Sequence, residues 1–193
     1  MAREPEITDL ANCLNAMGAR ITGQGTDTLT IEGVTSLSSA THQVVGDRVE
    51  AGTFIMAAAM SGGSLTVRDI IPHHLDALFD VIRQTGVGFD VGDNFVTVTA
   101  DGRYKAQNVE TQAYPGFPTD LQAQFTAMMC LANGVSQISE TIFENRFMHV
   151  PELVRMGADI SVDGRTAVIR GKEALLPAPV MATDLRASVS LVL

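Results

Sequence analysis

Acidic residues open three separate apolar segments of this chain, and two of the three also carry an arginine within two positions. The residues are Asp47 with Arg48, Asp120, and Asp184 with Arg186. A carboxylate can accept the proton of a hydroxyl group, and an arginine can bind a carboxylate or a phosphate through two parallel hydrogen bonds. Because helix N-termini also attract anions, three such corners packed side by side would form a site for an anionic substrate. The alternative is that each aspartate only caps its helix.

A fourth group of polar residues lies within residues 141–153. Glu144 and Arg146 stand there among the apolar side chains of Ile142 and Phe143. One interpretation is a surface ion pair beside a helix start, which would contribute little stability. The other is a carboxylate and a guanidinium group held at a cleft by aromatic packing. Both interpretations are compatible with the sequence.

Histidine and cysteine residues are weaker candidates for chemistry. His73, His74 and His149 precede predicted helices, where capping or packing explains them better than metal binding. Cys13 and Cys130 lie far apart and show neither a CxxC motif nor zinc-ligand spacing. We therefore predict two buried thiols, no metal site and no cysteine nucleophile.

Composition narrows the class of protein. The chain has 193 residues, of which 46% are hydrophobic and 18% are charged, so it can fold around a core of its own. The formal net charge of −9, with no basic block, argues against a general nucleic-acid-binding protein. No apolar run is long enough to span a membrane, and residues 1–10 lack the apolar core of a signal peptide. These features predict a cytoplasmic protein that binds neither nucleic acid nor membrane.

One unit recurs along the chain: a short apolar helix, a glycine, and two alternating strands joined by a turn. Each glycine is a candidate for the left-handed residue that ends a helix, since glycine adopts that conformation without steric cost. The recurrence predicts a protein built from repeated α/β units. The three copies occupy residues 6–33, 74–102 and 149–171, with marker glycines Gly18, Gly86 and Gly157.

A second helix and strand precede the later copies, and this pattern begins again at Thr183. The unit order is therefore helix–strand–helix–strand–strand, which indicates an α/β or α+β fold with mixed sheets. The polar, turn-rich stretch from Val34 to Gly46 is a candidate linker. Leu193 falls inside the last apolar helix on this interpretation, which favours a piece of a longer repeat protein.

Three segments resemble a known enzyme family. YPGFPTDLQAQ (114–124), TIFENRFMHVPELVRMGA (141–158) and PVMATDLRASVSLVL (179–193) are similar to the UDP-N-acetylglucosamine 1-carboxyvinyltransferases, a family of enolpyruvyl transferases. The resemblance implies an inside-out α/β barrel, with helices inside and sheets outside, made of repeated βαβαββ-type units and incomplete here. Residues 1–45 would be the end of the first domain. Residues 46–193 would be two units of the second domain plus the start of a third.

The resemblance also implies a reaction. Enzymes of this family transfer the enolpyruvyl group of phosphoenolpyruvate to the 3-hydroxyl of UDP-N-acetylglucosamine and release phosphate, the first committed step of peptidoglycan synthesis. By that resemblance Asp120 binds the sugar hydroxyl and takes its proton, and neither a cofactor nor a metal takes part. Ile142 and Phe143 would lie beside the UDP-sugar. Glu144 and Arg146 would bind at the phosphoenolpyruvate end, and Asp184 and Arg186 would also lie at phosphoenolpyruvate. Asp47 and Arg48 would be substrate-binding residues at the domain boundary.

Several parts of the family's site have no counterpart in this chain. They are the mobile loop with the reactive cysteine, which neither Cys13 nor Cys130 matches, the amino-terminal Lys-Asn pair, the uridine-binding segments and a later arginine. Because the family's cleft lies between two domains, closure around both substrates would need the missing remainder of the parent chain. We expect the isolated chain to have little or no activity. The alternatives are a non-catalytic truncated paralogue that binds a ligand, and the sister transferase that makes enolpyruvylshikimate phosphate.

Overall fold

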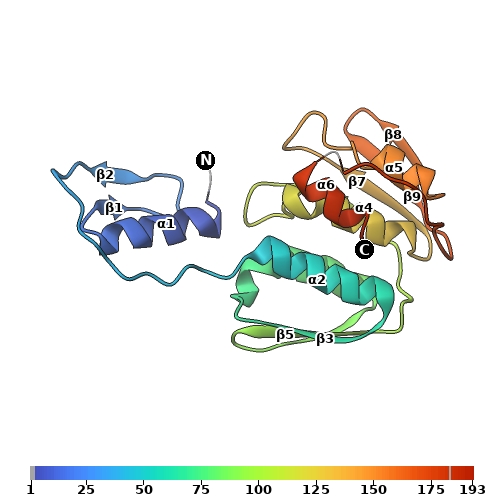
Figure 1. The fold of residues 1–193 in the computed structure, drawn as a ribbon, viewed down its shortest axis with the longest axis horizontal. Helices are drawn as coiled ribbons and strands as arrows, with labels where there is room; N and C mark the ends of the chain where they lie inside the picture. Colours follow the sequence, from blue (N-terminus) through green and yellow to red (C-terminus); the bar gives the residue numbers. More distant parts are fainter. Residues whose placement is uncertain (1–2, 183) are drawn as a thin grey trace.

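The computed structural model describes residues 3–182 and 184–193, so Thr183, where we predict that the third pattern begins, lies outside the described residues. The chain forms a small N-terminal unit, an extended connection and two larger α/β units (Figure 1). In the N-terminal unit, helix α1 (Pro5–Ala16) lies beside an antiparallel hairpin of β1 (Arg20–Thr22) and β2 (Thr30–Glu32).

The connection runs from the N-terminal unit to helix α2 and covers residues 33–47. All of these residues are described, and they contain neither helix nor strand. Figure 1 shows the segment as an extended trace between the blue unit and α2. The predicted linker, Val34 to Gly46, therefore coincides with irregular backbone, while the assignment of residues 1–45 and 46–193 to two domains stays a prediction.

The second unit is a helical layer on a three-stranded antiparallel sheet with strand order β3-β5-β4. Gly92 and Asp93 lie in the turn between β4 and β5, where the repeated unit predicts a turn. The elements are α2 (Arg48–Ser61), β3 (Gly63–Arg68), the 3-10 helix η1 (Pro72–Leu75), α3 (Asp76–Thr85), β4 (Gly88–Val91) and β5 (Phe95–Ala100).

The third unit repeats this order on a four-stranded sheet, β6-β7-β9-β8, in which only β6 and β7 pair in parallel. Helix α6 (Leu185–Ser190) then begins the next copy of the pattern. The elements are β6 (Val109–Glu110), η2 (Thr119–Leu121), α4 (Gln122–Cys130), β7 (Val135–Ser139), α5 (Val150–Arg155), β8 (Asp159–Asp163) and β9 (Thr166–Arg170).

Helices α2, α4 and α6 lie on the inner side of the sheets (Figure 1). Helix α4 contacts both α2 and α6, while α2 covers β3 and β5 and α4 covers β7 and β9. Every residue of α4 is buried, and its Phe125 and Met128 belong to the core together with Met56 and Ile138. This placement of apolar helices inside and sheets outside confirms the predicted layering. The three-stranded and the four-stranded sheet are both open in the described structure.

Gly52 allows α2 and the start of α4 to approach closely. A Cβ atom added at Gly52 would lie 2.6 Å from Cδ1 of Leu121 and 3.2 Å from Cδ2 of Leu78. Both leucines are fully buried, so neither has room to give way. The small residue therefore brings the Asp47 and Asp120 ends of the two inner helices close together.

The predicted order of elements is confirmed, and the three marker glycines adopt the left-handed conformation, with φ of 100° at Gly18, 90° at Gly86 and 95° at Gly157. The prediction that Leu193 lies inside the last helix is wrong, because α6 ends at Ser190. The chain tightens there through i→i−3 bonds, from Leu191 N–H to the Ser188 carbonyl (3.2 Å) and from Val192 N–H to the Val189 carbonyl (3.0 Å).

The two cysteines differ in burial, which corrects the prediction of two buried thiols. Cys130 is fully buried in α4, where its Sγ donates to the Thr126 carbonyl (3.2 Å) and burial raises the thiol pKa to about 12. Cys13 is only half-buried, because α1 rests on a two-stranded hairpin and buries little besides Pro5 and Ala11. Among the described helices, none has both the length and the apolar character needed to cross a bilayer.

Candidate functional site

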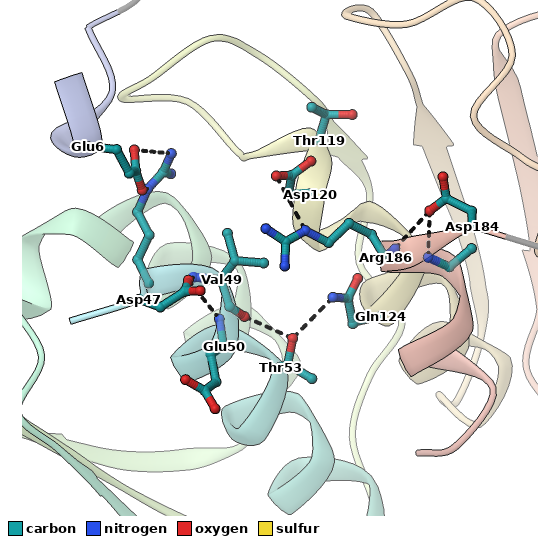
Figure 2. Close-up of polar contacts among 12 residues, drawn as sticks. Glu6, Asp47, Val49, Glu50, Thr53, Thr119, Asp120, Gln124, Asp184 and Arg186 are labelled. Carbon is teal, nitrogen blue, oxygen red and sulfur yellow. Dashed lines mark hydrogen bonds and ion pairs between the residues drawn. The ribbon is translucent and has the colours of Figure 1, made fainter. Parts of the chain in front are cut away.

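Two of the three predicted corners are helix caps. Oδ1 of Asp47 accepts hydrogen bonds from Val49 N–H (2.7 Å) and Glu50 N–H (3.1 Å) at the start of α2. Oδ1 of Asp184 accepts from Arg186 N–H (2.8 Å) and Ala187 N–H (2.9 Å) at the start of α6 (Figure 2). The bond from Ala187 is the main cause that lowers the pKa of Asp184. The capping interpretation is therefore correct for these two aspartates.

Asp120 is not a cap. It lies in the 3-10 turn η2, and the structure shows no side-chain cap at the described start of that turn or of α4. Its carboxylate instead faces two guanidinium groups, with Arg146 Nη2 2.6 Å from Oδ1 and Arg186 Nε 3.5 Å from Oδ2. Figure 2 shows the Arg186 side chain reaching from α6 to Asp120. We call Asp120, Arg146 and Arg186 the Asp120 cluster.

Arg146 is held on three sides. Its Nη1 donates to Oγ1 of Thr119 (2.8 Å), its Nη2 donates to Asp120, and its Cζ lies 4.8 Å from the centre of the Phe143 ring. These contacts leave 20% of the side chain exposed, against 37% for Asp120. A guanidinium group suits this position because its planar fork can serve two acceptors while its face stacks on an aromatic ring.

Glu144 does not pair with Arg146. Its side chain is 85% exposed and lies 3.7 Å from Nη2 of Arg165. The turn that brings Phe143 and Arg146 to Asp120 leaves Glu144 on the solvent side. Of the two interpretations of this segment, the aromatic packing of the second holds for Arg146, which lines a water-sized cavity rather than an open cleft. The surface ion pair of the first holds for Glu144 with a different partner.

Arg48 joins the N-terminal unit to α2. Its Nε and Nη2 donate to the two carboxylate oxygens of Glu6 at 2.8 and 3.3 Å, and its Cζ lies 5.5 Å from the Tyr114 ring centre. Arg48 itself is buried. The sequence offers no signal for Glu6 as a partner, because 42 positions separate the two residues and nothing local marks either of them.

Two clefts share Asp120 in their linings. One, of about 550 Å³, lies between α1, the connection and α2, and includes Cys13, His42, Arg48, Asp120 and Arg186 in its lining. The other, of about 270 Å³, includes Arg48, Tyr114, Asp120, Ile142 and Phe143. The structure thus brings together six of the predicted residues around two hollows that share Arg48 and Asp120 in their linings. The six are Asp47, Arg48, Asp120, Ile142, Phe143 and Arg186. A larger hollow of about 780 Å³, beside His73 and His74, contains none of the predicted substrate-binding residues in its lining.

Glu140 is a site residue that the sequence reasoning missed. Only 1% of it is exposed. Its Oε1 accepts from Thr111 Oγ1 (2.9 Å), Ile142 N–H (2.8 Å) and Phe143 N–H (3.0 Å), and its Oε2 accepts from Thr119 Oγ1 (2.8 Å). A period-two signal was available, because the buried residues Ser136 and Ile138 place Glu140 on the same inward face.

His149 is buried beside the cluster, and the prediction that it caps or simply packs at its helix is incomplete. It precedes α5 without a side-chain cap, and neither ring nitrogen has a hydrogen-bond partner among the described residues. Burial lowers its pKa to about 4, with Arg146 adding to the effect and Asp184 opposing it. The imidazole is therefore neutral at pH 7, and it lines a water-sized cavity together with Arg146, Asp184 and Arg186.

Comparison with known proteins identifies the family. The whole chain, residues 1–193, matches the family described as EPSP synthase (3-phosphoshikimate 1-carboxyvinyltransferase). The chain belongs to this carboxyvinyltransferase family. It is 57% identical over 193 residues to the UDP-N-acetylglucosamine 1-carboxyvinyltransferase of Glaesserella parasuis, and 57% identical over 192 residues to that of Geobacter metallireducens. In both cases it covers 46% of the relative, so the chain spans about half the length of the curated relatives it matches.

Solved structures agree with the carboxyvinyltransferase fold. The enolpyruvyl transferase NikO from Streptomyces tendae superposes with a TM-score of 0.83 at 28% identity, over 98% of this chain and 46% of NikO. The EPSP synthase from Acinetobacter baumannii superposes with a TM-score of 0.62 at 17% identity, over 92% of this chain and 45% of that enzyme. The second likeness supports the fold alone.

Opposite charges meet at the Asp120 cluster. The cluster combines two guanidinium groups with one carboxylate, whereas the cleft of about 550 Å³ is lined by more carboxylates than arginines, with Glu4, Glu6, Asp9 and Asp47 beside Asp120. The nearby Asp184 carboxylate already accepts two N–H groups of α6. A partly exposed guanidinium beside a carboxylate can bind a phosphate or a carboxylate and leave the Asp120 oxygens to accept a hydroxyl proton.

Proposed function

We propose that this chain carries one wall of the active site of a UDP-N-acetylglucosamine 1-carboxyvinyltransferase. The observation that carries the proposal is the Asp120 cluster, a carboxylate that lies between two arginines and lines two clefts. The names of relatives 57% identical to this chain support the choice of the nucleotide-sugar substrate. The proposal includes a cytoplasmic reaction that belongs to peptidoglycan synthesis, as the family resemblance implies.

The reaction needs a base, a proton donor and two anion-binding groups. In the addition step, the 3-hydroxyl oxygen of the sugar forms a bond to C2 of phosphoenolpyruvate, C3 gains a proton from a general acid outside this wall of the site, and the hydroxyl proton goes to Asp120. In the elimination step, the bond from C2 to the phosphate oxygen breaks, phosphate leaves, and C3 returns a proton to that acid. Arg146 and Arg186 are the groups that would hold the phosphate and carboxylate charges during both steps.

The turn at residues 142–146 would contact the sugar nucleotide. The N–H groups of Ile142 and Phe143 are already bound to Glu140, so these residues would offer their exposed side chains and remaining carbonyl groups to the ligand. Glu144 points to solvent, and a contact between it and phosphoenolpyruvate would require the turn to close over the ligand. The capping residues Asp47 and Asp184 would act by fixing α2 and α6.

A second candidate is a binding function without chemistry. The Asp120 cluster could hold the nucleotide sugar while the other wall of the family's cleft is absent, since closure around both substrates needs that wall. The isolated chain is then expected to bind ligand and not to turn it over. The third candidate, transfer to shikimate phosphate, differs in the acceptor that the site recognises.

Calorimetric titration with UDP-N-acetylglucosamine tests the proposal. Asp120→Ala should abolish the binding, whereas Asp90→Ala, at an exposed position of β4, should leave it unchanged. Shikimate 3-phosphate titrated into the same chain serves as the competing acceptor. Circular dichroism of each variant keeps loss of binding separate from loss of fold.

The outcomes assign the function. Binding of the nucleotide sugar that depends on Asp120, together with enolpyruvyl transfer when the chain is joined to the remainder of its parent protein and supplied with phosphoenolpyruvate, supports the enzyme. Binding without transfer by the joined protein supports the binding function, and preference for shikimate 3-phosphate supports the sister activity. A folded chain that binds neither acceptor contradicts the proposal for this chain.

A further inference from the structure

Glu140 is a buried carboxylate that the proposed reaction does not use. It follows β7 on the inward face, and only 1% of it is exposed. Burial of a charged carboxylate is costly unless hydrogen bonds compensate for the lost water. Glu140 has four such bonds, and all four donors belong to segments that lead to the Asp120 cluster or support it.

The carboxylate fixes the direction of two hydroxyl protons. A carboxylate only accepts hydrogen bonds, and a threonine hydroxyl has a single proton. Thr119 therefore donates to Oε2 of Glu140 (2.8 Å) and presents a lone pair to Nη1 of Arg146 (2.8 Å). In the same way, Thr111 donates to Oε1 (2.9 Å) and accepts from Thr141 N–H (2.9 Å).

Arg146 depends on Glu140 for two of its three contacts. The first contact is the hydrogen bond to Thr119, whose hydroxyl is oriented by Oε2 of Glu140. Phe143, the aromatic contact, has its N–H bound to Oε1 at 3.0 Å. Only the third contact, with Asp120, forms without a direct bond to Glu140.

We propose that Glu140 is a positioning residue of the substrate site. Its carboxylate orients the Thr119 hydroxyl and holds the Phe143 turn, so that the Arg146 guanidinium meets Asp120. The effect on substrate binding rests on the proposed function, whereas the effect on the position of Arg146 does not.

Glu140→Gln is the sharpest variant, because it keeps the shape and changes the hydrogen bonding. The substitution removes the negative charge that strengthens all four bonds. The new amide nitrogen is also a donor: at the Oε1 position it would face two N–H groups that cannot accept, and at the Oε2 position it would make the Thr119 hydroxyl accept and turn its own proton away. Glu110→Gln is the matched control, since it makes the same change at an exposed residue of β6. Thr119→Val removes the hydroxyl at nearly constant shape, and Thr119→Ser retains it.

The first readout needs no ligand. Amide hydrogen exchange of Ile142 and Phe143, followed by NMR, should accelerate about tenfold in Glu140→Gln, the size expected when the acceptor of their hydrogen bonds loses its charge. The side-chain Nε–H signal of Arg146 should shift in Glu140→Gln and in Thr119→Val. Both signals should stay unchanged in Glu110→Gln, and the Arg146 signal should return to its original position in Thr119→Ser.

The second readout is the affinity for UDP-N-acetylglucosamine. Glu140→Gln and Thr119→Val should each weaken binding about tenfold, and the double variant should be less than a hundredfold weaker, because the two substitutions share the route through the Thr119 hydroxyl. Thr119→Ser should bind as the unmodified chain does. A purely structural role would not be rescued by the serine hydroxyl.

Two results would overturn the proposal. One is a folded Glu140→Gln chain in which the exchange of Ile142 and Phe143 and the Arg146 signal are unchanged. The other is a Thr119→Ser chain that resembles Thr119→Val. If Glu140→Gln does not fold, the comparison of Thr119→Val with Thr119→Ser tests the proposal. If the unmodified chain does not bind the nucleotide sugar, the proposed function fails for this chain, and the ligand-free readout still decides the role of Glu140.

Discussion

Arg146 occupies a position that an ammonium group could not fill. Its two terminal nitrogens bind different acceptors, Thr119 and Asp120, while its face lies on Phe143. Arg146→Lys keeps the charge and loses this geometry. We expect the affinity for UDP-N-acetylglucosamine to fall about tenfold, roughly 1.4 kcal/mol, as measured by calorimetry. Arg103→Lys, at an exposed position, is the matched control, and equal affinities for the two variants would contradict the expectation.

His149 links stability to pH. Burial lowers its pKa from 6.5 to about 4, so the unfolded chain takes up the proton first as the pH falls between these values. Stability should therefore be lost as the pH falls through this window, and the loss from this group between pH 7 and pH 5 should be about 2 kcal/mol. Urea unfolding of the unmodified chain and of His149→Phe at both pH values measures it.

The unmodified chain and His149→Phe differ in pH dependence only through the histidine, because the carboxylates contribute equally to the stability loss of both chains. His149→Phe should lose about 2 kcal/mol less between pH 7 and pH 5 than the unmodified chain. Parallel pH profiles would show that His149 gains its proton in the folded state as easily as in the unfolded state.

At the scale of elements, the approach of α2 to α4 depends on Gly52. Gly52→Ala would improve helix propensity by about 1 kcal/mol, but its Cβ would lie 2.6 Å from the buried Leu121. Overpacking of a rigid core costs more than this gain, so we expect a net destabilisation of roughly 1–2 kcal/mol in chemical unfolding.

A double-mutant cycle identifies the cause. Leu121→Ala removes the clashing methyl groups, so Gly52→Ala should destabilise the Leu121→Ala background less than the unmodified chain. Strictly additive effects would mean that the contact between Gly52 and Leu121 does not limit the approach of the helices.

At the scale of the whole molecule, we expect the connection of residues 33–47 to be the segment that a protease cuts most easily. It has neither helix nor strand, and the ion pair between Arg48 and Glu6 ties its end to α1. Limited proteolysis with thermolysin should cut this segment first and release a resistant piece that begins near α2. Glu6→Gln should accelerate the cut, and initial cleavage within α2 or α4 would contradict this account.

The sequence predicts the repeated elements well because each one has a local signal. Apolar periodicity marks the helices, and Gly18, Gly86 and Gly157 mark their ends. The two-residue strand β6 shows no such periodicity, because it is too short to contain any. The helical assignment of Leu193 fails because i→i−3 bonds near the chain end are not encoded in apolar spacing.

The candidate site is predicted less completely, because its contacts are long-range. Asp47, Asp120 and Asp184 look alike in sequence, and only the packing of Arg146 and Arg186 against Asp120 distinguishes them. The local sequence gives only a weak signal for Glu140 and no signal for Glu6. Contacts between residues more than 20 positions apart depend on how the units pack, which periodicity does not report.

The unequal burial of the two cysteines provides a selective attachment point. Cys130 is closed off in the core and its thiol pKa is about 12, so a maleimide reagent at neutral pH will not modify it in the folded chain. Cys13 is half-exposed and lines the cleft that also contains Asp120 and Arg186. A fluorophore attached there would report on movement between α1 and the Asp120 cluster without any engineered residue.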